Sequence, residues 1–210
     1  MFSEKKHVAC LARTAWLNDQ NHIPMAYPNQ TLQNPLIGQD ITFLRTGKET
    51  GGALLEMEAR YQGRSQEPPP HYHPQQEEDF TVLKGELSVR IDGQVKVLKA
   101  GDTLHIPANT VHAMWNHSDQ PTAVNWKVRP ALHTDQLLET GIGLANDGKT
   151  NRKGVPPLLQ AALMGRHFSG EYRLARPPYP LQKIAFALLA PIAYLFGYRP
   201  VYRKYLDQAP

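Results

Sequence analysis

The chain has 210 residues and a formal net charge of +4, with 41% hydrophobic and 20% charged residues. These values are typical of a folded globular protein and exclude an intrinsically disordered chain. The length allows one domain with a real core and is too short for two domains of ordinary size. The basic residues are scattered and no known nucleic-acid-binding motif accompanies them, so we expect no nucleic-acid partner.

The N-terminal segment, residues 1–39, is polar, has no sustained period and is interrupted by prolines. We expect an N-terminal arm there, with room for one edge strand. The first twenty residues contain no apolar run of signal-peptide length. Cys10 is the sole cysteine of the sequence, so no intramolecular disulfide can form. A cytoplasmic location is therefore expected.

Residues 40–130 consist of short segments in which apolar and polar residues alternate. In one of them, Leu55, Met57, Ala59 and Tyr61 share a face, as in a strand buried on one side. Asp92-Gly93 is a strong hairpin signal between two such segments. About eight strands separated by Gly, Pro, Asn and Asp turns predict a mainly β fold, an antiparallel barrel or double-sheet jelly roll.

Strong metal-ligand side chains crowd together in residues 68–86, PPPHYHPQQEEDFTVLKGE. His71 and His73 are two positions apart, so both can point to one side if the backbone is extended. In the strand that follows, Glu78 shares the apolar face and should point inward. Glu77 shares the opposite face and is expected to be a solvated charge.

A second segment, residues 101–116, offers a further ligand in His112, which follows a turn at residues 107–109. Met114 and Asn116 share the face of His112 if this stretch is a strand. His105 alternates with apolar neighbours and is expected to face away from the others.

Together the two segments resemble the paired motifs of the cupin superfamily, and in particular its single-domain, quercetinase-like members. The first segment reproduces the HxH pair, the glutamate and the closing glycine of that family at its spacing. The second keeps Gly101, Pro107, His112 and Asn116 in place. It departs at Asn109, where the family usually has glycine, but asparagine tolerates a positive φ well.

The resemblance implies a fold and a metal site. The fold is an antiparallel double-stranded β-helix over residues 40–130. The implied ligands of a divalent transition metal are His71, His73, Glu78 and His112, and the ion could be Fe, Mn, Ni, Cu or Zn. Four protein ligands on an octahedral ion leave two positions open, as in reactive sites. The inward residues expected to line a pocket beside it are Phe80, Val82, Met114 and Trp126.

The function implied by the resemblance is that of a mononuclear metal-dependent dioxygenase acting on a small organic substrate. Glu78 is the candidate catalytic residue, because it could change from ligand to base. Cupins with the same ligands also act as isomerases and decarboxylases, so those reactions stay open. A non-catalytic cupin that binds a small ligand is the alternative from another class, and a cavity plugged by side chains would favour it.

The last segment, residues 131–210, lacks strand signals and is expected to be a helical extension. Residues 135–146 and 156–168 are predicted helices, the second with prolines at its start. Residues 184–198 are apolar all round, contain Pro191 and have basic flanks. They are too short to be a convincing spanning helix. Three interpretations stay open: packing on the barrel or on a second subunit, contact with a membrane surface, or a lid over the metal cavity. Alternating edge strands and this apolar segment also make a homodimer plausible.

Overall fold

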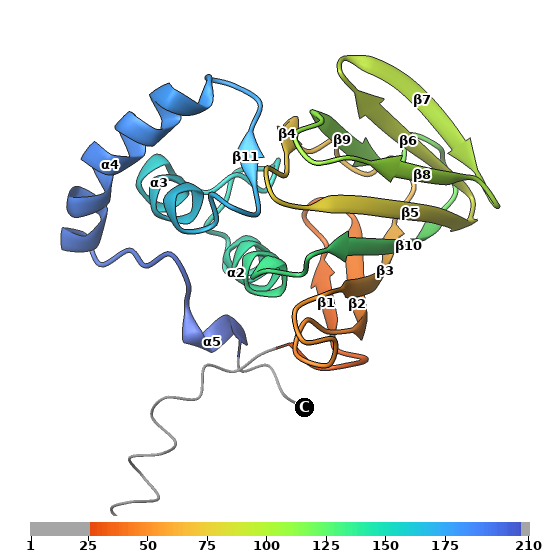
Figure 1. The fold of residues 1–210 in the computed structure, drawn as a ribbon, viewed down its shortest axis with the longest axis horizontal. Coiled ribbons are helices and arrows are strands. Elements are labelled where there is room, and N and C mark those ends of the chain that lie inside the picture. The colour runs from red at the N-terminus through yellow and green to blue at the C-terminus, as the bar shows by residue number, and fades with distance from the viewer. Residues whose placement is uncertain (1–25, 207–210) are drawn as a thin grey trace, which may run out of the picture.

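The structure is a computed structural model that describes residues 26–206 (Figure 1). Two antiparallel sheets face each other and form a barrel, and the helices gather on one side of it. The fold is therefore mainly β with helices at the C-terminal end. This confirms the fold class predicted from the alternating segments and from the resemblance.

The larger sheet has six strands in the order β1-β2-β3-β10-β5-β8. Its members are β1 (Thr31–Asn34), β2 (Gln39–Arg45), β3 (Leu55–Tyr61), β10 (Thr122–Arg129), β5 (Glu77–Lys84) and β8 (Thr103–Ile106). The second sheet has five strands in the order β11-β4-β9-β6-β7. Its members are β11 (Arg173–Leu174), β4 (His71–Tyr72), β9 (His112–Trp115), β6 (Glu86–Ile91) and β7 (Gln94–Lys99).

Alternation along each strand decides which side chains fill the barrel. On β3 the predicted face is the buried one, and it carries Leu55, Met57, Ala59 and Tyr61. On β5 the same alternation buries Glu78 between apolar neighbours and leaves Glu77 exposed. A carboxylate therefore enters the barrel interior because it occupies an inward position of the strand.

Two turns adopt the conformations that their residues favour. Asp92 and Gly93 have φ angles of 46° and 86° and join β6 to β7, with Ile91 opposite Gln94. This is the two-residue hairpin that the Asp-Gly pair predicts, since both central residues need a positive φ. Asn109 has a φ of 67°, so it takes the left-handed conformation that glycine usually supplies.

The six-stranded sheet begins within the segment that was expected to be an arm. β1 is its edge strand and pairs with β2, with Thr31 opposite Thr42. This agrees with the single edge strand that the sequence allowed within residues 1–39. Residues 1–25, which include Cys10, lie outside the described residues.

The C-terminal extension contains α2 (Thr134–Asn146), α3 (Leu158–His167), α4 (Tyr179–Leu195) and α5 (Arg203–Leu206). The expectation that strands end at residue 130 is wrong. Residues Arg173–Leu174 form β11 and pair with β4 in the second sheet. Two residues are too few to show an alternating pattern, so this strand depends on the neighbour that it pairs with rather than on its own sequence.

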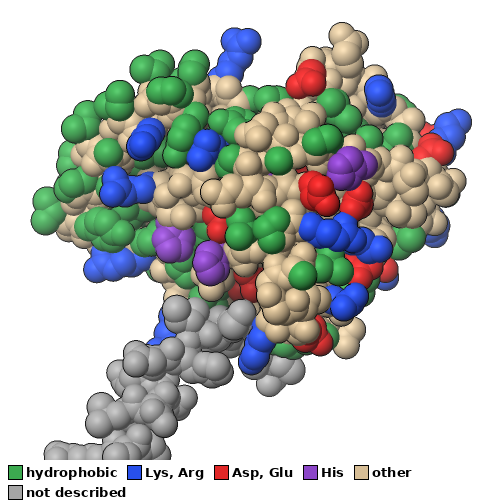
Figure 2. All heavy atoms as spheres, viewed as in Figure 1, with side chains coloured by type: hydrophobic (Ala, Val, Ile, Leu, Met, Phe, Trp, Pro, Cys, Tyr) green, Lys and Arg blue, Asp and Glu red, His purple; other side chains and the backbone are tan. Residues whose placement is uncertain are grey.

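One face of α4 packs on the fold and the other is uncovered. Ala190 and Ala193 lie against Leu163 of α3. In Figure 2, apolar side chains gather on the side of the molecule where α4 lies in Figure 1. The opposite face of α4 exposes five large apolar side chains: Leu181, Ile184, Leu188, Ile192 and Leu195. We call these five residues the α4 apolar face. No helix among residues 26–206 is long and apolar enough to cross a membrane.

Glu139 is a buried acid in the helical layer. It lies on α2, is 1% exposed, and its Oε1 accepts a hydrogen bond of 2.9 Å from Nε2 of Gln30. Oε2 has no hydrogen-bond partner. Burial raises the pKa of Glu139 to about 8, with Gln30 acting to lower it and Asp135 to raise it further. The folded protein therefore holds a proton here that the unfolded chain releases in mildly acidic solution.

This raised pKa predicts how stability depends on pH. The native state binds one more proton than the unfolded state between the ordinary glutamate pKa and about 8, so Glu139 makes the folded state less stable as pH rises through that range. The Glu139→Gln variant keeps an acceptor for Gln30 and removes the ionisation. We expect it to exceed the wild type by roughly 4–5 kcal/mol in the free energy of unfolding at high pH, and to match it at low pH.

Urea unfolding at about pH 5 and about pH 8.5 measures this difference. Glu77→Gln, which removes an exposed carboxyl group, is the matched control and should leave the pH dependence unchanged. An identical pH dependence in the wild type and Glu139→Gln would contradict the prediction.

Candidate metal centre

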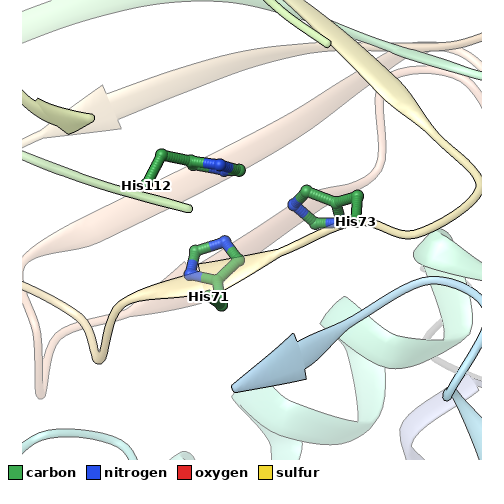
Figure 3. Close-up of side chains that lie close together, drawn as sticks. All are labelled: His71, His73 and His112. Carbon is green, nitrogen blue, oxygen red and sulfur yellow. The ribbon is translucent and has the colours of Figure 1, made fainter. Parts of the chain in front are cut away.

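The predicted ligands come from three strands that meet inside the barrel. His71 lies on β4 and is paired across the sheet with His112 on β9, while His73 follows β4 directly. Glu78 reaches the same point from β5 in the opposite sheet. The three imidazoles point toward one another in Figure 3. Residues from two distant parts of the sequence are thus brought together by strand pairing.

The distances suit a single ion. One ligand nitrogen from each histidine lies within 4.8 Å of the others. Oε2 of Glu78 is 2.9 Å from Nε2 of His112 and 3.4 Å from Nε2 of His73. All four side chains that the sequence named therefore converge, and three imidazoles with a carboxylate are a donor set that divalent first-row metals accept.

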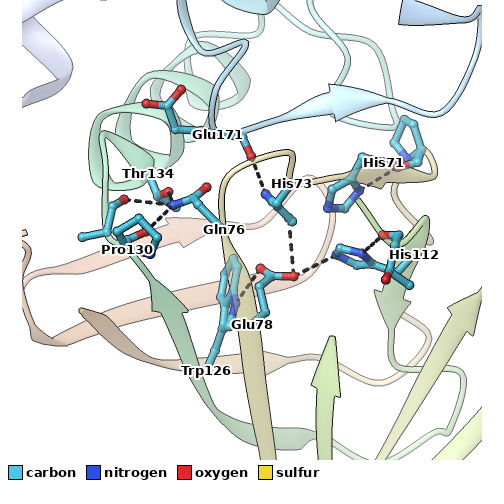
Figure 4. Close-up of polar contacts among 12 residues, drawn as sticks. His71, His73, Gln76, Glu78, His112, Trp126, Pro130, Thr134 and Glu171 are labelled. Carbon is cyan, nitrogen blue, oxygen red and sulfur yellow. Dashed lines mark hydrogen bonds and ion pairs between the residues drawn. The ribbon is translucent and has the colours of Figure 1, made fainter. Parts of the chain in front are cut away.

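Backbone carbonyls determine which ring nitrogen each histidine presents. Nδ1 of His71 donates to the Pro69 carbonyl at 3.1 Å, and Nδ1 of His112 donates to the Thr110 carbonyl at 2.9 Å. Nδ1 of His73 donates to the Glu171 carbonyl at 2.5 Å (Figure 4). With the proton held on Nδ1, the lone pair of each Nε2 faces the centre of the cluster. Hydrogen bonds of this kind orient metal-binding histidines.

Glu78 is held in place by its second oxygen. It is 1% exposed, and its Oε1 accepts a hydrogen bond of 2.9 Å from Nε1 of Trp126. Burial by itself acts to raise the pKa of Glu78, but His73 and His112 outweigh it and lower the pKa to about 2. The group is therefore a carboxylate with one oxygen fixed and the other turned toward the histidines.

Burial and the neighbouring charges also shift the pKa values of the histidines. Burial, reinforced by the neighbouring His112 and His73, lowers the pKa of His71 to about 3. For His112, burial acts to lower the pKa, yet the hydrogen bond and charge of Glu78 prevail and raise it. His71 is therefore neutral, while the carboxylate of Glu78 stabilises a proton on His112.

The facing atoms need a positive charge between them. Nε2 of His73, Nε2 of His112 and Oε2 of Glu78 are all buried and have no polar partner other than one another. If each Nδ1 carries the proton, these three atoms are all acceptors, and acceptors at such distances repel. Either a proton on His112 or a metal ion relieves this. The residues present therefore fit a metal ion.

A segment from the C-terminal extension covers the cluster. The ring of Tyr172 stacks on His71 with centroids 4.6 Å apart, and its burial raises the pKa of its hydroxyl. β11 pairs with β4, and the amide of Ala175 donates to the Pro70 carbonyl. The sequence analysis missed this cover, because nothing in the sequence near Tyr172 shows that the chain returns to the barrel.

Gln76 is a second residue that the sequence analysis missed. It is buried just before β5, and its Nε2 donates to the Pro130 carbonyl, the Ala131 carbonyl and Oγ1 of Thr134 (Figure 4). These bonds tie the ligand-bearing segment to the start of α2. The strand that carries Glu78 is thereby anchored to the helical layer.

The remaining named residues differ in their surroundings. His105 faces away, as expected, and pairs with Asp79 at 2.8 Å on the exposed side of the sheet. Phe80, Val82 and Met114 belong to a packed core cluster, and Trp126 stacks on Phe80. None of these four lines the cavity of about 490 Å³ beside His112 or the cavity of about 290 Å³ between the barrel and the helices. Their role as pocket residues stays a prediction.

Comparison with known proteins decides the family. The family model described as "Cupin domain" matches residues 57–127, which run from β3 to β10 and include all four converging side chains. The barrel is a cupin domain. The match does not cover the helical extension, so the family says nothing about α2 to α5.

Curated relatives match parts of the chain. A 43-residue stretch is 49% identical to quercetin 2,3-dioxygenase of Bacillus subtilis, which covers 20% of this chain and 13% of that protein. A longer match, 28% identical over 151 residues, links the chain to "Probable oxidoreductase virH" of Hypocrea virens and covers 66% of this chain and 67% of that protein. The chain thus spans a small part of the dioxygenase and about two thirds of the oxidoreductase.

Solved structures resemble the cupin domain at lower identity. An RmlC-like cupin from Shewanella frigidimarina is 22% identical and has a TM-score of 0.43, covering 52% of this chain and 93% of that chain. KdgF from a Halomonas species is 17% identical with a TM-score of 0.40, covering 47% of this chain and 84% of that chain.

Proposed function

We propose that the chain is a mononuclear metal-dependent dioxygenase that acts on a small organic substrate. The observation that carries the proposal is the cluster of His71, His73, His112 and Glu78, in which the facing atoms of His73, His112 and Glu78 are buried with no polar partner outside the cluster. The partial similarity to a quercetin dioxygenase and to an oxidoreductase supports the reaction class.

The protein's own groups have distinct tasks in this proposal. A bound divalent transition metal supplies a Lewis acid with open positions for substrate and dioxygen chemistry. The carbonyls of Pro69, Thr110 and Glu171 keep each histidine in the metal-binding tautomer. Trp126 holds one oxygen of Glu78, so the other is free to bind the metal or to accept a proton from the substrate.

The cover over the cluster favours a second candidate function. The barrel interior contains a packed cluster, and Tyr172 lies flat on His71. A plugged interior of this kind supports a cupin that binds a small ligand without catalysis. Isomerase and decarboxylase chemistry on the same ligands also stays open. For a dioxygenase, the cavity of about 490 Å³ that His112 and Arg90 line is the space from which a substrate would approach the cluster.

Metal content tests the proposed metal centre. We expect the protein, purified without added metal, to carry close to one equivalent of iron, copper, nickel, manganese or zinc by elemental analysis. The double variant His73→Ala, His112→Ala removes two ligands and should retain less than about a tenth of it. The matched control is His105→Ala, which removes an exposed histidine that faces away from the cluster. Loss of metal in the control, or its absence from the wild type even when ions are offered, would reject the metal centre.

Dioxygen consumption tests the proposed reaction class. The metal-loaded protein should consume one dioxygen per substrate molecule with a member of a panel of phenols and diketones that includes quercetin. Glu78→Gln, loaded to the same metal content, should lower kcat by about 100-fold or more if the carboxylate takes the substrate proton. Saturable ligand binding without oxygen uptake would replace the dioxygenase with the non-catalytic cupin.

We also propose that the chain forms a cytoplasmic homodimer through the α4 apolar face. Five large apolar side chains recur along one side of the helix, and Leu188 is 69% exposed. Contiguous exposed apolar surface of this kind is typical of an interface. A second copy of the same face would bury it symmetrically.

Sedimentation equilibrium tests the dimer. The wild type should have the mass of two chains, and Leu188→Glu should have the mass of one, because a charge in the apolar interface is costly to bury. The control Leu83→Glu replaces a leucine that is 50% exposed on β5, away from α4, and should remain dimeric. A monomeric wild type that binds vesicles of anionic lipid would instead assign the face to a membrane surface.

A further inference from the structure

A cavity of about 290 Å³ lies between the cupin domain and the helical extension. Its walls come from the β1–β2 region, from Pro68 and Pro69 before β4, and from α2, α3 and α4, which lie together beside β11 in Figure 1. The histidines of the candidate metal centre do not line it. A cavity of about 150 Å³ is enough for benzene. This space therefore has room for a substituted benzene ring.

Apolar side chains form most of the walls. They include Leu138 and Ile142 of α2, Met164 of α3 and Phe186 of α4. Water between such walls has few partners for hydrogen bonds, so an apolar molecule replaces it readily. The ligand should therefore present an apolar body.

Gln182 of α4 supplies a hydrogen-bond acceptor to the wall. It lines the cavity and is 3% exposed. Its Nε2 donates to the Leu174 carbonyl at 2.8 Å and to the Pro177 carbonyl at 2.6 Å, so both N–H groups are used and the orientation of the amide is fixed. Its Oε1 has no hydrogen-bond partner among the described residues. A buried acceptor of this kind favours a ligand that brings a donor.

Asn34 adds a second amide to the wall. It is the last residue of β1, lines the cavity and is 5% exposed. Its side chain makes no hydrogen bond within the part of the chain that the structure describes. A hydroxyl group both donates and accepts, so it can bond either end of this amide. Unpaired buried amides are costly to the fold, and a ligand with a hydroxyl group would reduce that cost.

The charges on the wall narrow the class of ligand. Lys153 and Arg173 line the cavity, and none of the described residues on its wall is an aspartate or glutamate, so an ammonium group would be repelled. Lys153 is exposed, and the guanidinium of Arg173 stacks on Tyr179, so neither offers a free buried charge to an anion. A carboxylate also has no donor for Oε1 of Gln182. A neutral hydroxyl group meets all these conditions.

We propose that this cavity binds a neutral, mainly apolar molecule that carries a hydroxyl group and has the size of a substituted phenol. Its apolar body lies among α2, α3 and α4, and its hydroxyl group donates to Oε1 of Gln182. The site needs no metal. It is a second binding site, because the candidate metal centre lies inside the barrel and does not line this cavity.

Gly141 allows the cavity to be filled without disturbing the fold. It lies on α2 and lines the cavity, and a Cβ built there meets no atom within 4 Å. Leucine is also a better helix former than glycine. Gly141→Leu is therefore the blocking variant. The matched control is Ala187→Leu, which adds a leucine to the exposed surface of α4 outside the cavity.

Calorimetric titration of the full chain with two isomers tests the proposal. 4-Ethylphenol has a hydroxyl donor, and 4-methylanisole contains the same atoms but no donor. We expect the wild type to bind the phenol at least about fivefold more tightly than the ether. Gly141→Leu should weaken the phenol at least about tenfold, and Ala187→Leu should bind like the wild type.

Two further variants locate the hydroxyl group and separate this cavity from the metal centre. Gln182→Met removes the acceptor at similar volume, so it should bind the two isomers within about twofold of each other. The double variant His73→Ala, His112→Ala should bind the phenol like the wild type, because the cavity needs no metal. The isomer preference of the wild type tests the donor even if Gln182→Met does not fold.

Each contrary outcome overturns a stated part of the proposal. Absence of binding to the wild type, or unchanged binding to Gly141→Leu, would overturn the site. Equal affinities of the wild type for the two isomers would overturn the hydroxyl group as the recognised feature, and tighter binding of 4-ethylbenzoate would overturn the neutral class. Loss of binding in the double histidine variant would assign the phenol to the metal centre instead.

Discussion

The site depends on three main-chain carbonyls that accept hydrogen bonds from the Nδ1–H groups of three histidines. Because Pro69, Thr110 and Glu171 hold each proton on Nδ1, each Nε2 lone pair is turned toward the same point as Oε2 of Glu78. Facing acceptors destabilise one another unless a cation lies among them. A positive charge among these atoms would therefore stabilise the barrel interior. The surrounding strands keep the atoms buried, so water cannot replace that charge.

The helical extension is part of this arrangement. It supplies the carbonyl of Glu171, the ring of Tyr172 and the two residues of β11 that lengthen the second sheet. It also helps to enclose an apolar cavity that Tyr172 lines. A single residue thus lies between two spaces with different chemistry, one lined by ligand atoms and one by apolar side chains.

Local patterns predicted much of the fold and most of the centre. Alternation placed Glu78 inside and Glu77 outside, Asp92-Gly93 predicted the hairpin, and His105 was expected to face away. Each of these depends on neighbours in sequence, so each is visible in a single segment. β11, Gln76 and Tyr172 were missed because their partners are distant along the chain, and no periodic pattern marks such contacts. Three interpretations were left open for the apolar residues 184–198, and α4 packs one face on α3 while its other face is exposed.

The sequence by itself determined the mainly β architecture and the residues that carry ligand atoms, because strand alternation and the spacing within the two motifs are local properties. The tertiary structure alone decided which nitrogen each histidine presents, what covers the cluster, and where an apolar cavity opens between barrel and helices. These features come from contacts between segments that are far apart in the chain, such as His73 with Glu171. Their geometry exists only after the sheets have paired and the helices have packed against them.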